Sequence, residues 1–456
     1  MTSQKRQLFG TDGIRGIAGE FPLTAESTYW IGRALGHNLL KSDPKPKVVI
    51  GQDTRQSGEW ITERVASGLA SCGVTVHNAG VITTPGVAYL ARTFGYAAGV
   101  VISASHNPWT DNGIKVFSGD GYKLPDEREL AIEHEIFALL ESGEGVPPAQ
   151  SSSLPEDAKL WHEYIEWLAK NVDRDLSALK PLIDCANGAA AAEAPELFKT
   201  VKIKADFLSI SPDGKNINES CGALHPQVVA KAVGDAKGKY DLGITFDGDA
   251  DRALFSDANG KVVNGDAVLL MVARDWQSQG KLPGSLVVAT TMSNMGLEVA
   301  LRSSGIRLLR ANVGDKYVLE EMKKTGAVLG GEQSGHIIFR DGDATTGDGL
   351  LTALRVLEVM ARTKKSLADL VGDLKVFPQT IKNIRVKEKV PFEQVPQIKS
   401  AIEAAERELN GNGRVVVRYS GTEALARVMV EAESEEKMKS LTEKIAQAIT
   451  EHLGVK

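Results

Sequence analysis

The amino-acid sequence predicts an α/β protein made of three successive α/β units and a smaller α+β domain at the C-terminus. Two observations predict this fold class. From about residue 47 onwards, short apolar runs rich in β-branched residues alternate with helix-like stretches, as in β-α-β units. Near residue 370 this alternation gives way to the pattern of a small mixed domain. A chain of 456 residues is long enough for several domains with separate cores.

The first unit shows the alternation most clearly. Residues 47–51 (KVVIG) predict a short buried strand, and residues 57–73 (SGEWITERVASGLASCG) predict an amphipathic helix that ends at a glycine. The runs VTVHNAG, TPGVAYLARTFG and AAGVVISAS continue the pattern. A break rich in proline and serine, GEGVPPAQSSSLPED, predicts the first domain boundary near residues 145–157.

The rest of the chain predicts two more α/β units and the C-terminal domain. KPLIDCANGAAAAEAPELFK and YDLGITFDGDADRALF belong to the second unit, and GSLVVATTMSNMGLEVALRSSG opens the third. TIKNIRVKEK, VPQIKSAIEAAERELNGNG, RVVVRYSGTEALARVMVEAES and a last helix-like segment predict a ferredoxin-like order of strand, helix, strand pair and helix. The predicted domains are residues 1–155, 156–253, 254–370 and 371–456.

Composition excludes several classes of protein. A net charge of −6 argues against a general binder of nucleic acid or membrane surfaces, which would need a basic field. The three cysteines are too few and too scattered for a disulfide framework, which fits a reducing compartment. The N-terminus lacks the pattern of a signal peptide, and no apolar run approaches the roughly 20 residues of a membrane span. We therefore expect a soluble cytoplasmic protein.

The strongest chemical signal is TFDGDADR, in which Asp247, Asp249 and Asp251 alternate with small residues. In an extended loop, a period of two would place the three carboxylates on one side of the chain. Such a cluster is repulsive without a cation, and oxygen ligands suit Mg²⁺ or Ca²⁺. An EF-hand is excluded, because Arg252 and Ala258 stand where that loop needs glycine and glutamate. A solvated acidic turn is the alternative, but a neighbouring arginine that can bind phosphate weakens it.

The motif SASHNP follows a predicted buried strand, and open α/β sheets bind their ligands at the C-terminal ends of strands. A serine here is a candidate phosphate acceptor, although capping of the next turn is an equal alternative for a serine taken alone. Ten residues after Ser105, Lys115 lies in the strand-like run GIKVF. We expect an Asn-Gly turn at residues 112–113 to bring this lysine towards the serine. There it could bind phosphate or move a proton, whereas a lysine alone in a strand is usually solvated.

A second polar motif, LGGEQSGHIIF, places Glu332, Ser334 and His336 between two apolar strands. Alternate residues of an extended segment share a face, so these three groups could converge on sugar hydroxyls. A polar hairpin tip without a ligand is the alternative.

A third polar motif, RYSGTE, follows the strand-like run RVVV. Its Arg418, Ser420, Gly421 and Thr422 offer a guanidinium, hydroxyls and free N–H groups. These donors suit a phosphate, although a Ser-Gly-Thr turn is also common as plain structure. Together the motifs supply a metal site, a serine acceptor, a lysine and a phosphate clamp. Phosphoryl transfer needs such groups, because it depends mainly on positioning and on neutralised charge.

The ordered motifs FGTDGIRG, SASHNP, DGDADR, GGEQSGH and RYSGTE resemble those of the α-D-phosphohexomutase superfamily over essentially the whole chain. This resemblance implies four domains around a central cleft: three related α/β/α units with mixed sheets and a smaller α+β C-terminal domain. It also implies a phosphosugar mutase that works through a phosphoserine, one Mg²⁺ and a bound sugar 1,6-bisphosphate.

The resemblance also implies a role for individual residues. Ser105 would carry the phosphate and bind Mg²⁺ together with Asp247, Asp249 and Asp251. Arg15 and Arg252 would support the phosphoserine, and Lys115 would assist proton transfer. The residues implied to bind the substrate are His106, Asp315, Glu332, Ser334, His336, Arg418, Ser420, Gly421, Thr422 and Arg427.

Within the superfamily, Gln333 and the segments TMSNMGLE and VGDKYVLEEM resemble the branch that acts on glucosamine phosphates. Three residues depart from the family pattern. Ala250 replaces a glycine and is tolerable there only if its φ is negative, because a left-handed conformation is costly for a residue with a Cβ atom. Ala424 replaces a proline, which predicts a less rigid loop. Lys316 replaces an arginine, which keeps the charge but loses the bidentate fork.

The implied reaction converts glucosamine 6-phosphate to glucosamine 1-phosphate, a step towards UDP-N-acetylglucosamine and cell-wall precursors. A sister mutase for mannose or glucose phosphates, a non-catalytic phosphosugar-binding protein and a phosphatase are the alternatives. Relatives in the superfamily are often homodimers. Priming of Ser105 by a kinase, by autophosphorylation or by a sugar bisphosphate is left open by the sequence.

Overall fold

The computed structural model describes residues 6–147, 154–157, 159–342, 344–420 and 423–455. The chain divides into two compact units. The first joins Met1–Met292 with Leu309–Val371, and the second joins Ser293–Leu308 with Gly372–Lys456. The segment 293–308 therefore belongs with the C-terminal domain in this division, although it lies within the third α/β region of the sequence.

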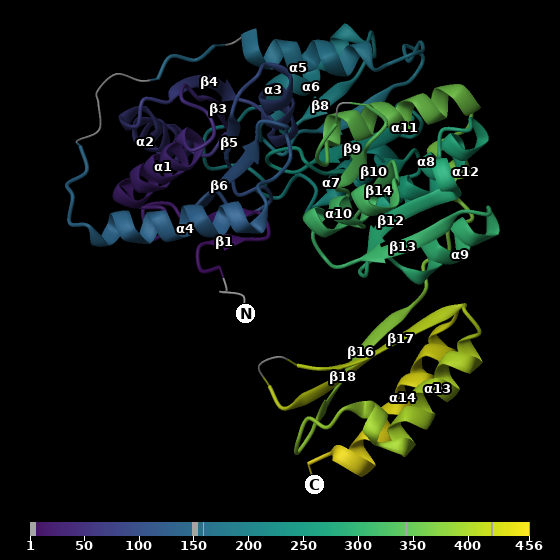
Figure 1. Ribbon diagram of the computed structural model, residues 1–456. Coiled ribbons are helices and arrows are strands. Elements are labelled where there is room, and N and C mark those ends of the chain that lie inside the picture. The colour runs from purple at the N-terminus through teal and green to yellow at the C-terminus, as the bar shows by residue number, and fades with distance from the viewer. Residues whose placement is uncertain (1–5, 148–153, 158, 343, 421–422, 456) are drawn as a thin grey trace. The chain divides into compact units, whose positions relative to one another are not determined.

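The first α/β region holds a mixed sheet between two layers of helices. Its elements are β1 (Phe9–Gly10), β2 (Gly13–Ile17), α1 (Ala25–Leu40), β3 (Lys47–Gln52), α2 (Gly58–Ser71), β4 (Thr75–Val81), α3 (Thr84–Thr93), β5 (Ala98–Ile102), β6 (Asp111–Ser118), α4 (Asp126–Glu141) and α5 (Lys159–Lys170). The strand order is β1-β2-β6-β5-β3-β4. Figure 1 shows α1, α2 and α4 on one side of the sheet and α3 with α5 on the other. Strand β5 (AGVVI) is buried throughout, as expected for a strand covered on both faces.

The second α/β region follows α5 and repeats this architecture on a smaller scale. It contains β7 (Pro181–Asp184), α6 (Ala190–Thr200), β8 (Asp206–Leu208), α7 (Pro226–Asp235), β9 (Leu242–Phe246), β10 (Ala253–Asp257) and β11 (Val262–Val263). The sheet order is β11-β10-β9-β7-β8. Strands β7, β8 and β9 are parallel, whereas β10 turns back antiparallel to β9.

The third α/β region has the sheet order β13-β12-β14-β15, with β12 and β14 parallel and β15 antiparallel to β14. Its elements are α8 (Gly265–Ser278), a 3-10 turn at Pro283–Ser285, β12 (Leu286–Thr290), α9 (Met295–Ser303), β13 (Arg307–Ala311), α10 (Asp315–Thr325), β14 (Leu329–Gly331), β15 (Ile337–Phe339), α11 (Gly349–Thr363) and α12 (Leu367–Val371). Strands β9 and β14 thus end in the loops that carry the acidic motif and the GEQSGH motif.

The C-terminal domain is an antiparallel sheet of order β16-β18-β17 covered by two helices. Its elements are β16 (Gln379–Arg385), a 3-10 turn at Phe392–Gln394, α13 (Pro396–Leu409), β17 (Gly413–Tyr419), β18 (Leu425–Ala432) and α14 (Glu435–Leu453). Helix α9 belongs to this unit, because the amide of Asn294 donates to buried Glu431 at 3.1 Å. At the other end of α9, Arg302 donates to Gly411 O at 3.0 Å.

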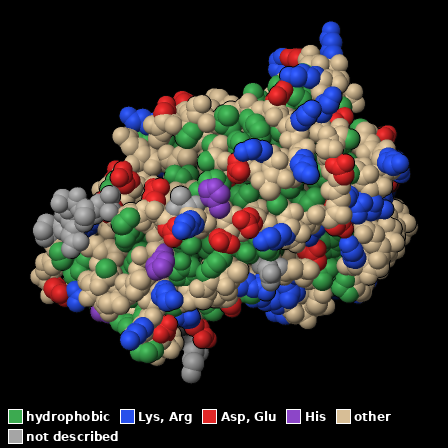
Figure 2. Space-filling view, turned by 90° about the horizontal axis from the view of Figure 1, so that it is seen from above, with side chains coloured by type: hydrophobic (Ala, Val, Ile, Leu, Met, Phe, Trp, Pro, Cys, Tyr) green, Lys and Arg blue, Asp and Glu red, His purple; other side chains and the backbone are tan. Residues whose placement is uncertain are grey.

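The predicted fold class is confirmed: mixed α/β sheets are followed by a small α+β domain. The predicted boundaries at residues 155, 253 and 370 stay predictions. Among the described residues, none of the helices is both long and apolar enough to cross a bilayer. On the face drawn in Figure 2, basic and acidic side chains are interspersed.

Candidate phosphoryl-transfer and metal site

Ser105 lies in the loop between β5 and β6 and is only 1% exposed. Its Oγ donates a hydrogen bond to Asp247 Oδ2 at 2.5 Å and lies 3.2 Å from Nδ1 of His106. A φ of +52° places Ser105 in the left-handed region, which is uncommon for a residue with a Cβ atom. Ser103, by contrast, donates to Asp53 at 2.6 Å. Of the two serines, Ser105 is therefore the one whose hydroxyl contacts the acidic motif.

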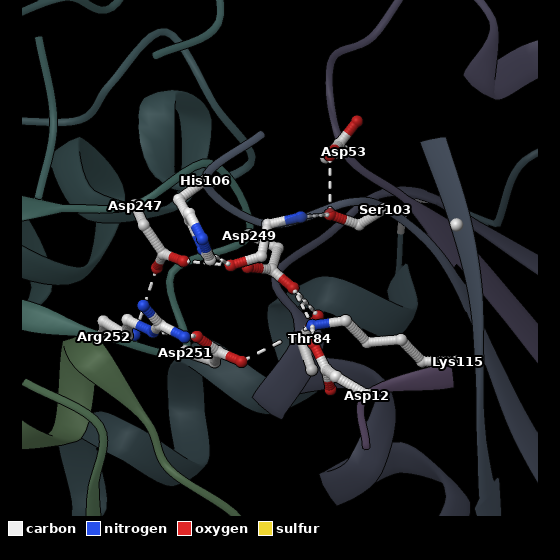
Figure 3. Close-up of polar contacts among 12 residues, drawn as sticks. Asp12, Asp53, Thr84, Ser103, His106, Lys115, Asp247, Asp249, Asp251 and Arg252 are labelled. Carbon is white, nitrogen blue, oxygen red and sulfur yellow. Dashed lines mark hydrogen bonds and ion pairs between the residues drawn. The ribbon is translucent and has the colours of Figure 1, made fainter. Parts of the chain in front are cut away.

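The three aspartates lie in the turn between the antiparallel strands β9 and β10. All three are buried, and one carboxylate oxygen from each lies within 4.8 Å of the others (Figure 3). The expected clustering is present, but the extended loop invoked to explain it is wrong. Ala250 N donates to Asp247 O at 3.0 Å and closes a tight turn. The carboxylates converge because the chain reverses direction there.

Ala250 has a φ of +53°, so the condition that its φ must be negative is wrong. A left-handed conformation costs a residue with a Cβ atom roughly 1–2 kcal/mol. The first residues of two helices hold the turn: Gly349 N in α11 donates to Ala250 O at 2.9 Å, and Thr84 N in α3 donates to Asp249 O at 3.0 Å. The positive ends of two helix dipoles thus face the acidic turn, which offsets part of the repulsion among its carboxylates.

Lys115 on β6 adds a buried positive charge beside the aspartates. Its Nζ lies 2.7 Å from Asp249 Oδ2, 3.0 Å from Asp12 Oδ2 and 3.5 Å from Asp251 Oδ2. Burial alone would lower the pKa of Lys115, but the three carboxylates outweigh this effect and raise the pKa well above its ordinary value. Lys115 is therefore an ammonium ion that neutralises part of the acidic cluster.

The Asn-Gly turn expected at residues 112–113 is wrong, because both residues lie inside strand β6. Gly113 pairs with Arg15 of β2, and a Cβ atom on Gly113 would lie 2.6 Å from Ser103 O. The glycine therefore allows a close backbone approach within the sheet. Lys115 is positioned by the antiparallel pairing of β6 with β5.

The acidic turn fits a divalent metal ion. Asp249 Oδ1 and Asp251 Oδ1 are buried and accept no hydrogen bond from the described residues, so both are available to a cation. Burial, and then the charges of Asp251 and Asp249, raise the pKa of Asp247 well above its ordinary value. A bound cation would remove this repulsion, and an all-oxygen donor set suits hard divalent ions.

A cavity of about 430 Å³ opens beside this centre, within the size range of small-molecule sites. Seven of the residues expected to act in the site line it: Arg15, His106, Asp251, Arg252, Asp315, Glu332 and His336. Burial and the charges of Arg252 and Arg15 lower the pKa of His106 to about 4, so its imidazole is neutral at pH 7. The structure thus brings residues from three α/β regions to one cavity.

Glu332, Ser334 and His336 lie in the tight turn between β14 and β15. Glu332 and His336 both line the cavity, whereas Ser334 Oγ donates to Glu332 Oε2 at 3.2 Å. Gly314 N donates to the other carboxylate oxygen of Glu332 at 3.1 Å. Nε2 of His336 lies 3.0 Å from Gly347 N, and Nδ1 lies 3.6 Å from an oxygen of Asp251. Burial alone would lower the pKa of His336, but the carboxylates of Asp251 and Asp315 outweigh this effect and raise the pKa to about 9. Glu332 therefore lines the cavity with its carboxyl group held by two uncharged donors.

Two further cavity residues, Asp12 and Lys123, carry no signal in the sequence that singles them out. Lys123 Nζ bridges Asp12 Oδ1 at 2.6 Å and Asp315 Oδ2 at 2.7 Å. Burial alone would raise the pKa of Asp12, but Lys115, Lys123 and Arg15 together lower it well below its ordinary value. These partners come from distant segments, so only the folded chain brings them together. Lys316, which stands where the family has an arginine, forms an ion pair with Asp126.

The RYSGTE motif lies in the second unit, between β17 and β18. Arg418 and Arg427 are direct partners across this antiparallel pair, so both guanidiniums project from one face of the sheet. Arg418 is exposed, and Arg427 makes a single long ion pair of 3.6 Å with Glu423 among the described residues. Ser420 is buried and accepts a hydrogen bond on its Oγ from Glu423 N at 3.3 Å. Gly421 and Thr422 lie outside the described residues.

Two adjacent like charges destabilise a strand pair unless an anion binds them. The arginine pair is therefore suited to a phosphate. Ala424, next to the motif, is exposed, and its carbonyl accepts a hydrogen bond from Val386 N at 3.0 Å.

Comparison with known domain families gives four consecutive matches. Residues 6–142 match phosphoglucomutase/phosphomannomutase alpha/beta/alpha domain I, residues 162–260 match domain II, and residues 264–377 match domain III. Residues 381–448 match the C-terminal domain of the same family.

The chain is also similar in sequence to relatives over nearly its full length. The chain is 61% identical over 461 aligned residues to a phosphoglucosamine mutase of Koribacter versatilis, covering 100% of this chain and 99% of the relative. It is 50% identical to a phosphoglucosamine mutase of Solibacter usitatus, covering 98% of this chain and 99% of the relative.

Two solved structures show the same fold. A phosphoglucomutase/phosphomannomutase family protein from Burkholderia thailandensis superposes with a TM-score of 0.77 at 24% identity, over 98% of this chain and 99% of its own. The N-acetylphosphoglucosamine mutase of Aspergillus fumigatus, solved in complex with GlcNAc-6P and magnesium, superposes with a TM-score of 0.61 at 18% identity, over 98% of this chain and 96% of its own.

Proposed function

Because this chain belongs to the phosphoglucomutase/phosphomannomutase family, whose four domains it carries in order, we propose that it interconverts glucosamine 6-phosphate and glucosamine 1-phosphate. The chain is a phosphosugar mutase by family. The choice of glucosamine is supported by curated relatives that are named phosphoglucosamine mutase and match the chain over its full length. Glucosamine 1-phosphate would feed the synthesis of UDP-N-acetylglucosamine and cell-wall precursors.

In the proposed reaction, phosphorylated Ser105 donates its phosphoryl group to the free 1-hydroxyl of glucosamine 6-phosphate. The bond from phosphorus to Oγ breaks as a bond to sugar O1 forms, and the hydroxyl proton ends on Oγ. The products of this half-reaction are an unmodified serine and a bound 1,6-bisphosphate. The bisphosphate then turns over in the site, and its 6-phosphoryl group returns to Ser105. Glucosamine 1-phosphate leaves, and the phosphoserine is restored.

The observation that carries this proposal is the 2.5 Å hydrogen bond from Ser105 Oγ to Asp247, beside Lys115 and a cavity. Because Oγ lies this close to Asp247, a phosphate on Oγ would lie next to the acidic turn. We assign Lys115 to proton transfer, because an ammonium ion next to the turn can protonate the departing Oγ and regain a proton from the sugar. Arg15 and Arg252 line the same cavity and would bind the phosphate oxygens.

We assign one Mg²⁺ to Ser105, Asp247, Asp249 and Asp251. Two buried oxygens that accept no hydrogen bond from described residues support this assignment. Such an ion, when bound, would neutralise negative charge on the phosphoryl group during its transfer.

We assign the sugar hydroxyls to Glu332 and Ser334, with His106, Asp315 and His336 around them, because the Glu332 carboxylate faces the cavity. Gln333, the residue that resembles the glucosamine branch, donates its amide to Asp266 at 3.0 Å and so supports this turn.

The phosphate that is not reacting is assigned to Arg418, Ser420, Gly421, Thr422 and Arg427 of the C-terminal domain. The paired guanidiniums of Arg418 and Arg427 on one face of the sheet support this assignment. A cytoplasmic location, a homodimer and the agent that first phosphorylates Ser105 stay predictions.

A steady-state assay of glucosamine, glucose and mannose 6-phosphates, started with a catalytic amount of sugar 1,6-bisphosphate, tests the substrate. We expect the largest kcat/KM for glucosamine 6-phosphate, and a preference for mannose or glucose would overturn this choice. Ser105→Ala should bind the sugar phosphate without turning it over. Release of inorganic phosphate as the main product would favour a phosphatase, and unchanged function in Ser105→Ala would favour a binding protein.

A further inference from the structure

Arg55 is a buried arginine behind the Ser105 loop, and nothing in the proposed chemistry uses it directly. It follows β3 and is 2% exposed. An arginine side chain has five N–H donors in a rigid fork, and here each of them has an acceptor. Nε donates to Asp53 Oδ2 at 2.8 Å. Nη1 and Nη2 donate to four main-chain carbonyls, those of Ser105, Asn107, Pro108 and Asp111.

Three of these carbonyls belong to the loop that carries Ser105, and the fourth belongs to Asp111, the first residue of β6. Nη2 lies 2.8 Å from both Ser105 O and Asn107 O, and Nη1 lies 3.0 Å from Asp111 O. One guanidinium therefore forms hydrogen bonds along the whole segment from Ser105, the candidate phosphoserine, to the start of β6. Asp53 is fully buried and pairs with Arg55, so the guanidinium charge is balanced without solvent.

The backbone N–H of Ser105 is linked to the pair of Asp53 and Arg55 through the side chain of Ser103. Ser105 N donates to Ser103 Oγ at 2.9 Å, and Ser103 Oγ donates to Asp53 Oδ2 at 2.6 Å. Figure 3 shows Asp53 and Ser103 together at the edge of the acidic centre. The N–H and the C=O of Ser105 are thus both tied to the buried pair of Asp53 and Arg55.

A contact from the second α/β region completes this arrangement. Asn218 Nδ2 donates to Ser105 O at 2.9 Å and to Asn107 O at 3.3 Å. Gly248 of the acidic turn lies against the same carbonyl, since a Cβ atom on Gly248 would be 2.5 Å from Ser105 O. The loop and the acidic turn therefore meet backbone to backbone.

Ser105 has a φ of +52°, which costs of order 1–3 kcal/mol and persists only where the surroundings impose it. The hydrogen bonds that Arg55 and Asn218 donate to Ser105 O, and the one that Ser105 N donates to Ser103 Oγ, supply this constraint. With its backbone fixed on both sides, Ser105 keeps rotation about χ1 as its main freedom. The position of Oγ relative to the acidic turn is then set before any substrate binds.

We propose that Arg55 is a positioning residue for phosphoryl transfer: it fixes the backbone of Ser105 so that Oγ, and a phosphate on Oγ, faces the acidic turn. This inference rests on the proposed role of Ser105 as the phosphate carrier. Arg55 acts through the loop and contacts neither sugar nor phosphate. A misplacement of about 1 Å at a reacting atom can cost on the order of a hundredfold in rate.

Arg64 provides a matched control for a purely structural role. It is 6% exposed, lies on α2 of the same region, and donates to the main-chain carbonyls of Ala25 at 2.9 Å and Pro147 at 3.1 Å. Its guanidinium also lies over the ring of Tyr29. Arg64→Lys therefore removes hydrogen bonds of the same kind from the same region, but away from Ser105. The test compares Arg55→Lys with Arg64→Lys in the full-length protein.

Each enzyme is first phosphorylated with glucose 1,6-bisphosphate, and transfer from the phosphoserine to glucosamine 6-phosphate is followed in a single turnover. We expect Arg55→Lys to slow this transfer and kcat by about 10- to 100-fold while KM stays within about threefold of wild type. Arg64→Lys should stay within about twofold of wild type in both constants. The phosphorus NMR signal of the phosphoserine should shift or broaden in Arg55→Lys alone.

The inference is overturned if Arg55→Lys transfers within twofold of wild type, or if Arg64→Lys loses as much activity at an equal loss of thermal stability. If Arg55→Lys does not fold, Ser103→Ala decides the question: a drop of about tenfold in single-turnover rate supports the inference, and an unchanged rate contradicts it. If wild-type enzyme itself transfers no phosphate from Ser105, the proposed function fails instead, which is a separate result.

Discussion

The Ser105 centre and the arginine pair of the C-terminal hairpin both present charge suited to a phosphosugar, but they are built in opposite ways. Ser105, Asp247, Asp249 and Lys115 are all nearly inaccessible to solvent. Their positions depend on left-handed backbone, helix N-termini and a buried guanidinium. Arg418 is exposed, and Arg427 has only a long ion pair with Glu423 among the described residues.

This difference predicts which kinetic constant each region affects. A buried, pre-organised centre stabilises charge as it develops, so its loss should lower kcat. The exposed arginine pair is proposed to bind a phosphate group that does not change during the reaction, so its loss should raise KM. Changes to the two regions should therefore be distinguishable in steady-state kinetics.

The largest effect is expected from loss of the metal site. Removal of divalent ions by a chelator should lower kcat by at least about a thousandfold, because a metal ion contributes several kcal/mol to charge stabilisation. Added Mg²⁺ should restore activity. Asp249→Asn should weaken Mg²⁺ binding in calorimetry by at least about tenfold, because one buried carboxylate charge is lost. Asp235→Asn, at an exposed position on α7, should bind Mg²⁺ as wild type does, and normal binding by Asp249→Asn would contradict the assignment.

Gly248→Ala tests whether the two loops must touch. A Cβ atom here would lie 2.5 Å from Ser105 O, so the acidic turn and the serine loop would have to move apart. We expect kcat to fall by about a hundredfold with little change in KM. Gly145→Ala is the control, because no atom lies within 4 Å of its added Cβ atom. If Gly248→Ala keeps wild-type kcat, close backbone packing of the loops is not required for catalysis.

The hairpin arginines should show the opposite pattern. Arg418→Ala and Arg427→Ala should each raise the KM for glucosamine 6-phosphate by about 10- to 100-fold, since each removes a charge-assisted hydrogen bond worth about 1.5–3 kcal/mol. Either change should leave the thermal stability of the protein equal or higher, because it relieves repulsion between two like charges. Arg407→Ala, which removes an exposed arginine on α13, should leave KM unchanged. A fall in kcat with constant KM would place these arginines in the chemistry instead.

A smaller effect is the pH dependence of stability that the buried side chain of Glu193 causes. Glu193 on α6 is fully buried and accepts a hydrogen bond from Thr83 N at 3.0 Å. Burial raises its pKa from 4.5 to about 8. Between these values the folded chain holds a proton that the unfolded chain has lost, so the free energy of unfolding falls as pH rises, by up to about 1.4 kcal/mol per pH unit.

Glu193→Gln keeps the uncharged form at every pH and should remove this dependence. The melting temperature of the variant relative to wild type should therefore rise between pH 5 and pH 8, by roughly 1–2 °C per unit. Glu196→Gln on the same helix is the control, since this side chain is 40% exposed. Parallel pH profiles for Glu193→Gln and wild type would show that the buried carboxyl is ionised in the folded protein.

Patterns that depend on neighbouring residues could be predicted from the sequence. The alternation of apolar runs and helices predicts the α/β class, and the C-terminal order of strand, helix, strand pair and helix agrees with β16, α13, β17, β18 and α14. The spacing of Asp247, Asp249 and Asp251 predicts carboxylates that cluster, although a tight turn rather than the expected extended loop brings them together.

Features that depend on contacts between distant segments could not be predicted. The left-handed Ala250 is held by Gly349, 99 residues further along the chain, so its own sequence context gives no signal. The Asn-Gly pair at residues 112–113 suggests a turn, but both residues lie in β6, where the backbone of Ser103 approaches too closely for a Cβ atom on Gly113. Lys123 and Asp12 reach the cavity only through tertiary ion pairs.

The most direct test of the account follows phosphate through Ser105. Enzyme carrying a labelled phosphate is mapped by peptide mass spectrometry and then mixed with unlabelled glucosamine 6-phosphate. The account predicts one phosphate on Ser105 and rapid appearance of the label in glucosamine phosphates and their bisphosphate. Label on Ser103, label that stays on the protein, or label released as inorganic phosphate would contradict it.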